Sequence, residues 1–107
     1  MDPVEINAGA WYLRALRADT LMDDRPALAE MGVKDPQYVA HCAQNWKQDT
    51  RYTWAVCEPT TGEMLAQVDL DPATGDIGVA ARAGHEQAAQ TAADAVRRFA
   101  DANELGF

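Results

Sequence analysis

The sequence predicts an α/β fold of the α+β kind, with a mainly antiparallel sheet of about four strands and helices packed on it. The first observation is an alternating or β-branched composition in four short segments, at residues 11–17, 52–57, 64–71 and 77–80. The second is a helical spacing of apolar residues in the segments 36–49 and 86–102. Short turns join the last three strands, so we expect an antiparallel meander. The predicted order is strand, two helices, three-strand meander and helix.

The first half of the chain supplies one strand and two helices. Residues 1–10 show no clear pattern and are interpreted as a loose lead-in. After the strand, Asp24 is a candidate cap for a short helix that ends before Gly32. Asp35 is a candidate cap for the next helix, because the following proline suits a first helical position.

The second half is expected to bury most of the large apolar side chains. The last helix carries alanine-rich residues on one face, at Ala88, Ala89, Ala92, Val96, Phe99 and Ala100. Such a face lets a helix lie close to a sheet. The three tryptophans are interpreted as core or interface anchors: Trp11, Trp46 and Trp54.

Length and composition indicate a single domain over residues 1–107. The chain is 48% hydrophobic and 24% charged, which is ordinary for a globular protein and excludes a wholly disordered one. No apolar run reaches the roughly 20 residues that a membrane span requires. The segment 1–5 is acidic and is not followed by an apolar stretch, so we expect no signal peptide.

Charge and cysteine content narrow the classes of partner. Nine basic residues against 17 acidic ones give a net charge of −8, so a basic face for nucleic acid or for an anionic membrane is not expected. Cys42 and Cys57 do not make a disulfide framework. We interpret both as small core residues and expect the cytoplasm as the compartment.

Several segments resemble the first half of the GCN5-related N-acetyltransferase (GNAT) family. Residues 12–19, Tyr-Leu-Arg-Ala-Leu-Arg-Ala-Asp, are similar to that family's opening strand. Residues 52–56 with 61–66 look like its first meander hairpin, and residues 76–79, Asp-Ile-Gly-Val, look like its central strand. The resemblance spans residues 11–107 and implies a GNAT-like fold with a site for acetyl-CoA.

The resemblance also assigns a cofactor loop. In the family, a loop of pattern Gln/Arg-x-x-Gly-x-Gly/Ala follows the central strand, opens a helix and binds the pyrophosphate of acetyl-CoA. Backbone N–H groups and the helix dipole make such a loop an anion site. The matching segment here points to Arg82, Gly84 and His85 as cofactor-binding residues. The alternative is an ordinary strand-to-helix loop.

The loop departs from the family pattern in either register. Starting from Arg82, the two glycine positions hold His85 and Gln87. Starting one residue earlier, Gly84 fits, but Glu86 takes the place of the second small residue. A carboxylate there would repel the pyrophosphate. We therefore expect acetyl-CoA binding to be weak or absent.

Carboxylates on the predicted meander are the candidate catalytic bases. Asp69 and Glu63 could accept a proton from a substrate amine, directly or through one water. The alternative for both, and for Asp71, is a solvated strand face. His41, His85, Cys42 and Cys57 lack the paired spacing of zinc ligands, so no metal site is expected.

The resemblance leaves three functions open. The family continues with a further strand, helix and strands, and this sequence does not match that portion. One hypothesis is a shortened acetyltransferase-like protein that does not catalyse and acts by protein binding or self-association. The second is an active acetyl-CoA-dependent N-acetyltransferase that completes its site in a dimer. The third is a small-ligand binding module. We expect a homodimer or a protein partner, with residues 77–80 and the helix from Glu86 at the interface.

Overall fold

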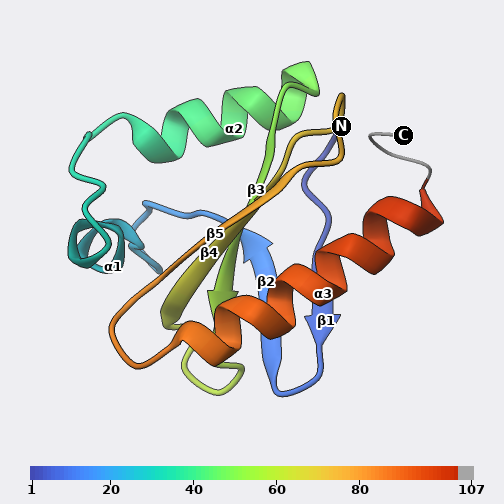
Figure 1. Ribbon diagram of the computed structural model, residues 1–107. Coiled ribbons are helices and arrows are strands. Elements are labelled where there is room, and N and C mark those ends of the chain that lie inside the picture. The colour runs from blue at the N-terminus through green and yellow to red at the C-terminus, as the bar shows by residue number, and fades with distance from the viewer. Residues whose placement is uncertain (104–107) are drawn as a thin grey trace.

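One antiparallel sheet of five strands organises the fold, and its strands lie side by side in the order of the chain (Figure 1). The computed structural model describes residues 1–103. The strands and helices are, in chain order, β1 (Ile6–Ala8), β2 (Trp11–Ala15), α1 (Arg25–Glu30), α2 (Tyr38–Gln48), β3 (Tyr52–Cys57), β4 (Met64–Leu70), β5 (Ile77–Ala81) and α3 (Glu86–Ala102). The predicted antiparallel α+β fold is confirmed.

Helices cover both faces of the sheet. Alternate residues of each strand point to opposite faces, so β4 sends Ala66, Val68 and Leu70 toward α3. On the other face, α1 and α2 pack on the sheet and bury a second cluster that includes Ala55 and Cys57 (Figure 1). Because both faces are covered, β3 is buried along its whole length.

The aromatic core lies between the end of α2 and the α3 face of the sheet. Trp46 stacks on Tyr52 with ring centroids 4.6 Å apart, and it meets Trp54 edge-on at 5.1 Å. Phe99 of α3 contacts Trp54 edge-on from the other side, at 5.7 Å. Trp46 and Trp54 are fully buried, and the partly buried Trp11 packs against the same cluster. The interpretation of the three tryptophans as core anchors is confirmed.

The start of the chain was predicted wrongly. Residues 6–8 form β1, which pairs with β2 so that Ile6 lies opposite Leu13. This strand adds a fifth member to a sheet expected to have about four. Three residues are too few to show an alternating pattern, and β1 is stabilised by pairing with β2 and by the burial of Ala8. Only the tertiary structure reveals it.

Both predicted caps precede their helices without a side-chain capping bond, and only the start of α2 differs from the prediction. Asp35 accepts a hydrogen bond from the Gln37 backbone N–H at 2.9 Å and begins a turn over residues 36–37, so α2 begins at Tyr38. Asp24 precedes α1 but makes no side-chain capping bond. Its carboxylate is instead engaged by Arg14 in a buried ion pair.

The last helix is confirmed at residues 86–102. Its predicted apolar face packs on the sheet, with Phe99 partly exposed. Val96 of this face is fully buried between α3 and the sheet. No helix within residues 1–103 is long and apolar enough to cross a membrane.

Candidate functional site

The loop between β5 and α3 has the backbone geometry of a strand-to-helix turn. The Arg82 N–H donates to the Leu65 carbonyl at 3.0 Å, and the His85 N–H donates to the Arg82 carbonyl at 3.0 Å. Gly84 has a φ of +87°, a left-handed conformation that glycine adopts without strain. α3 then begins at Glu86, and the N–H groups of its first turn have no partner within the helix.

The side chain of Arg82 does not serve this loop. Its guanidinium forms ion pairs with Glu63 and, at 3.0 Å, with Glu30 at the end of α1. It also donates to the Met64 carbonyl at 3.1 Å. The hydrogen bond to Glu63 is the main cause of a raised pKa for Arg82. Two carboxylates therefore surround one cation, and the cluster of Arg82, Glu63 and Glu30 carries a net negative charge.

This ion cluster borders a groove between α1 and the start of β4. The groove is lined on one side by Met22 and Pro26 and on the other by Thr61 and Met64. The structure thus brings together Arg82 and Glu63, which sequence analysis had assigned to different roles. Gly84 and His85 lie beyond them at the start of α3.

Asp69 occupies a separate position on β4. It follows Glu63 by six residues along an extended segment, which corresponds to about 20 Å. Its carboxylate accepts a hydrogen bond from Arg51 at 2.9 Å. It also lies over Gly78 of the neighbouring strand, where a Cβ atom would approach the Asp69 Oδ1 to 2.9 Å. The two candidate bases are therefore not brought together, and each has its own arginine.

Tyr38 lies over the same face of the sheet as Asp69. Its hydroxyl donates to the Gln67 Oε1 at 3.0 Å, and burial raises the pKa of Tyr38 to about 12. The phenol therefore keeps its proton at neutral pH. Its contact with Gln67 fixes α2 on the sheet.

The arginine and glutamate partners of the candidate residues were not predicted from the sequence. Arg51 could have been found, because Thr53 pairs with Asp69 across the sheet and Arg51 is two residues away on the same face. Glu30 could not have been found, because it is a helix-end residue far from Arg82 in the sequence. Only the packing of α1 beside β4 brings the two side chains together.

The cysteines are placed as core residues, as predicted. Both are buried and free. Burial raises the pKa of Cys57 to about 11 and also raises the pKa of Cys42. A protonated, enclosed thiol is a poor nucleophile. Among residues 1–103, no group of three or more histidine, cysteine, aspartate or glutamate side chains could hold a metal ion.

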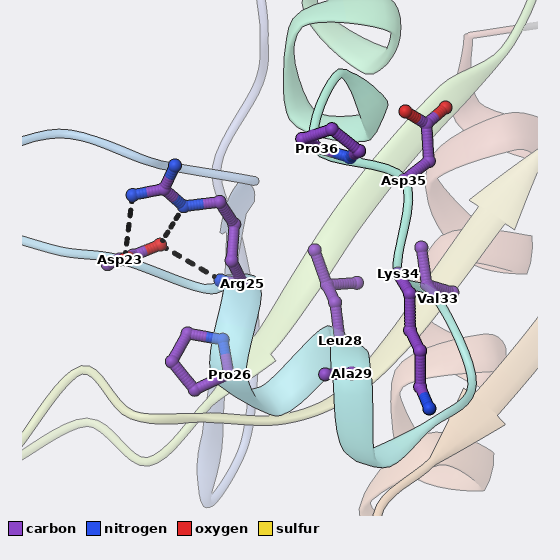
Figure 2. Close-up of a pocket in the computed structure, with 9 residues that line it drawn as sticks. All are labelled: Asp23, Arg25, Pro26, Leu28, Ala29, Val33, Lys34, Asp35 and Pro36. Carbon is purple, nitrogen blue, oxygen red and sulfur yellow. Dashed lines mark hydrogen bonds and ion pairs between the residues drawn. The ribbon is translucent and has the colours of Figure 1, made fainter.

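A more apolar pocket lies between α1 and the segment 33–36 that follows it. Figure 2 shows Leu28 and Val33 lining it, with the Asp23–Arg25 ion pair at one rim and Pro36 at the other. None of the residues predicted for catalysis or cofactor binding lines this pocket. It is therefore separate from the loop between β5 and α3.

The outer edge of β5 is the second distinctive feature near the loop. Within residues 1–103, β5 pairs only with β4. Val79 on this edge is 44% exposed, although it is a large apolar side chain. Beside it, α3 and β5 form a shallow hollow lined by Ile77, Val79, Gln90, Ala93, Asp94 and Arg97.

Comparison with known proteins supports the fold. No protein-family model matches the chain, and no curated protein matches it. A solved structure, of a putative ribosomal-protein-serine acetyltransferase from Vibrio cholerae, aligns with a TM-score of 0.78. The alignment covers 98% of this chain and 72% of that one. The fold is GNAT-like.

The low sequence identity means that only the backbone architecture, and no residue role, can be transferred from that structure to this chain. Sequence identity over the GNAT-like alignment is 17%, so the likeness concerns the backbone architecture. In that architecture, the loop at residues 82–85 follows the strand expected to be central. The chemistry of the GNAT-like chain therefore has to be argued from its own side chains.

Proposed function

We propose that this chain is a non-catalytic acetyltransferase-like protein that acts by binding another protein chain at the outer edge of β5, which has no strand partner within residues 1–103. Three features support the proposal. They are the ion cluster around Arg82, the pairing of both candidate bases with arginines, and the exposed apolar edge itself.

The observation that carries the proposal is the ion cluster. A pyrophosphate needs positive charge and free N–H donors. Here the guanidinium of Arg82 is directed to Glu63 and Glu30, and Glu86 adds a carboxylate in the first turn of α3. Like charges about 4 Å apart cost roughly 1–4 kcal/mol in water-like to surface-like surroundings. The residues present do not fit acetyl-CoA.

The surroundings of the two candidate bases also support a lack of catalysis. A general base must reach the amine that it deprotonates, directly or through one water. Asp69 is hydrogen-bonded to Arg51 and Glu63 to Arg82, so each carboxylate has a cationic partner.

Both cysteines are free and buried, which supports a reducing compartment, and we propose the cytoplasm.

Titration with acetyl-CoA tests the cofactor part of the proposal. We expect the thermal unfolding midpoint of the chain to stay constant up to millimolar acetyl-CoA. A ligand at 100 times its Kd would add about 2.7 kcal/mol to the free energy of unfolding. A micromolar Kd in calorimetry would contradict the proposal.

A gain-of-binding variant sharpens this test. Glu30→Gln combined with Glu63→Gln frees the Arg82 guanidinium, so binding of acetyl-CoA should strengthen about tenfold, or 1.4 kcal/mol. Asp2→Asn with Asp101→Asn is the matched control. It changes the net charge equally at two exposed residues outside the cluster and should leave binding unchanged.

A second candidate function is an active acetyl-CoA-dependent N-acetyltransferase that completes its site in a dimer. The position of Asp69 favours it, because the carboxylate lies over Gly78 on β5, the strand with the open edge. The family resemblance implies that the pantetheine arm of a bound cofactor would lie beside that strand. The left-handed Gly84 and the free N–H groups of α3 also suit an anion.

The release of CoA thiol by the natural sequence and by Asp69→Asn distinguishes the two candidate functions. With acetyl-CoA and a mixture of primary amines, we expect no release of CoA thiol above the uncatalysed rate, either from the natural sequence or from this variant. If turnover is measured, the second candidate requires Asp69→Asn to lower kcat/KM about 10²- to 10⁴-fold. Asp76→Asn, an exposed change on the same hairpin, is the control.

A further inference from the structure

The hydrogen-bond register of β4 and β5 determines which backbone groups face outward at the sheet edge. The Arg82 N–H donates to the Leu65 carbonyl, and the Asp71 N–H donates to the Asp76 carbonyl. In an antiparallel pair, alternate residues bond to the neighbouring strand. Gly78 and Ala80 therefore bond to β4. The N–H and C=O groups of Ile77, Val79 and Ala81 point away from the sheet.

Ile77 and Ala81 lie at equal distances along the strand on either side of Val79. If a second antiparallel copy of β5 is placed with its Val79 opposite this one, Ile77 of each copy lies opposite Ala81 of the other. Val79 then exchanges both hydrogen bonds with its own counterpart, and the two outer pairs do the same. Every outward N–H and C=O of the edge finds a partner about one two-fold axis.

The side chains of the edge do not oppose such pairing. Residues 77–81 contain no lysine, proline or other group that protects natural edges. Ile77, Val79 and Ala81 lie on the α3 side of the strand, and Val79 is 44% exposed. A second copy would cover this side chain with its own Val79.

The charged residues on the edge side of α3 are Asp94 and Arg97 beside the Val79 hollow, with Glu86 at the start of the helix. Arg97 donates to the Gly75 carbonyl at 3.2 Å, so it lies at the beginning of β5. Glu86 begins α3 just after the end of β5. An antiparallel arrangement brings the beginning of one β5 to the end of the other. Arg97 of each copy would then lie on the same side as Glu86 of the second copy.

We infer that the occupant of the β5 edge is a second copy of this chain, paired antiparallel about Val79 into a continuous ten-stranded sheet, twice the five strands of one copy. The inference rests on the proposed function, because pairing here covers the strand beside which the family resemblance places the cofactor. The interface combines edge hydrogen bonds, the Val79 contact and two Glu86–Arg97 pairs. Two-fold symmetry closes it without open growth.

Sedimentation equilibrium of the full chain at micromolar concentration tests the inference. The natural sequence should sediment as a dimer. Val79→Lys places two ammonium groups against each other at the axis, so it should sediment as a monomer with unchanged circular dichroism. Leu21→Lys makes the same chemical change at a side chain that is 85% exposed and distant from the edge; it should remain dimeric.

Charge reversal separates the pairing from a folding defect. Arg97→Glu should weaken dimerisation about tenfold or more, and the double variant Glu86→Arg with Arg97→Glu should restore it. A misfolded chain would not be rescued. The inference is overturned if Val79→Lys remains a dimer. It is also overturned if the natural sequence is still a monomer at 100 times the micromolar concentration used for sedimentation. Neither result affects the proposed lack of catalysis, which fails only if acetyl-CoA binds or is consumed.

Discussion

The Asp24→Asn variant is expected to lose about 3–5 kcal/mol of its free energy of unfolding, because it leaves a buried guanidinium without its counter-charge. Arg14 is 6% exposed and Asp24 is 1% exposed. Their two hydrogen bonds measure 2.8 and 2.9 Å. The same carboxylate accepts the Arg17 backbone N–H at 2.6 Å. Since domains of this size are stable by about 5–15 kcal/mol, urea denaturation should show a large loss.

Neighbouring substitutions provide the controls for this loss. Asp23→Asn alters the adjacent residue, whose ion pair with Arg25 is exposed, and should leave the urea midpoint nearly unchanged. Arg14→Met with Asp24→Leu removes both charges and should recover part of the loss. An Asp24→Asn midpoint equal to that of Asp23→Asn would show that the buried pair does not stabilise the fold.

Trp46→Ala is expected to lower the free energy of unfolding by about 3–5 kcal/mol, because it leaves a large cavity in the aromatic core. The ring is 1% exposed and contacts both Tyr52 and Trp54. Its Nε1–H donates to the Thr53 carbonyl at 3.1 Å. The substitution removes the packing and also leaves that carbonyl without its donor. Thermal and urea denaturation measure the change.

Trp46→Phe separates packing from hydrogen bonding. It keeps most of the ring contact and loses the Nε1–H donor, so its loss of stability should lie well below that of Trp46→Ala. Equal losses in the two variants would show that the hydrogen bond to Thr53, and not the packing, is the main contribution of this residue.

Local patterns predicted the long elements of the fold well. α3 has the predicted bounds, since an alanine-rich face with helical spacing persists over its whole length. β3 also matches residues 52–57, because aromatic and β-branched residues suit a buried strand. β1 was missed because its stability comes from pairing with β2 and not from its own three residues.

The candidate site was less predictable than the fold. The positions of Gly84 and His85 at the start of α3 followed from the strand–loop–helix order. The state of Arg82 did not, because its two carboxylate partners come from the end of α1 and the start of β4. Whether this loop presents the positive charge of Arg82 depends on such distant contacts, which the local sequence does not reveal.

The strand order has a consequence for the kinetics of folding. β1 with β2, and β3 with β4 and β5, are hairpin units built from contacts close in sequence. The pairing of β2 with β3 is different, because it closes a loop over residues 16–51 that includes both α1 and α2. Loop closure costs chain entropy before its contacts form. We therefore expect the two hairpin units to form early and the pairing of β2 with β3 to limit the folding rate.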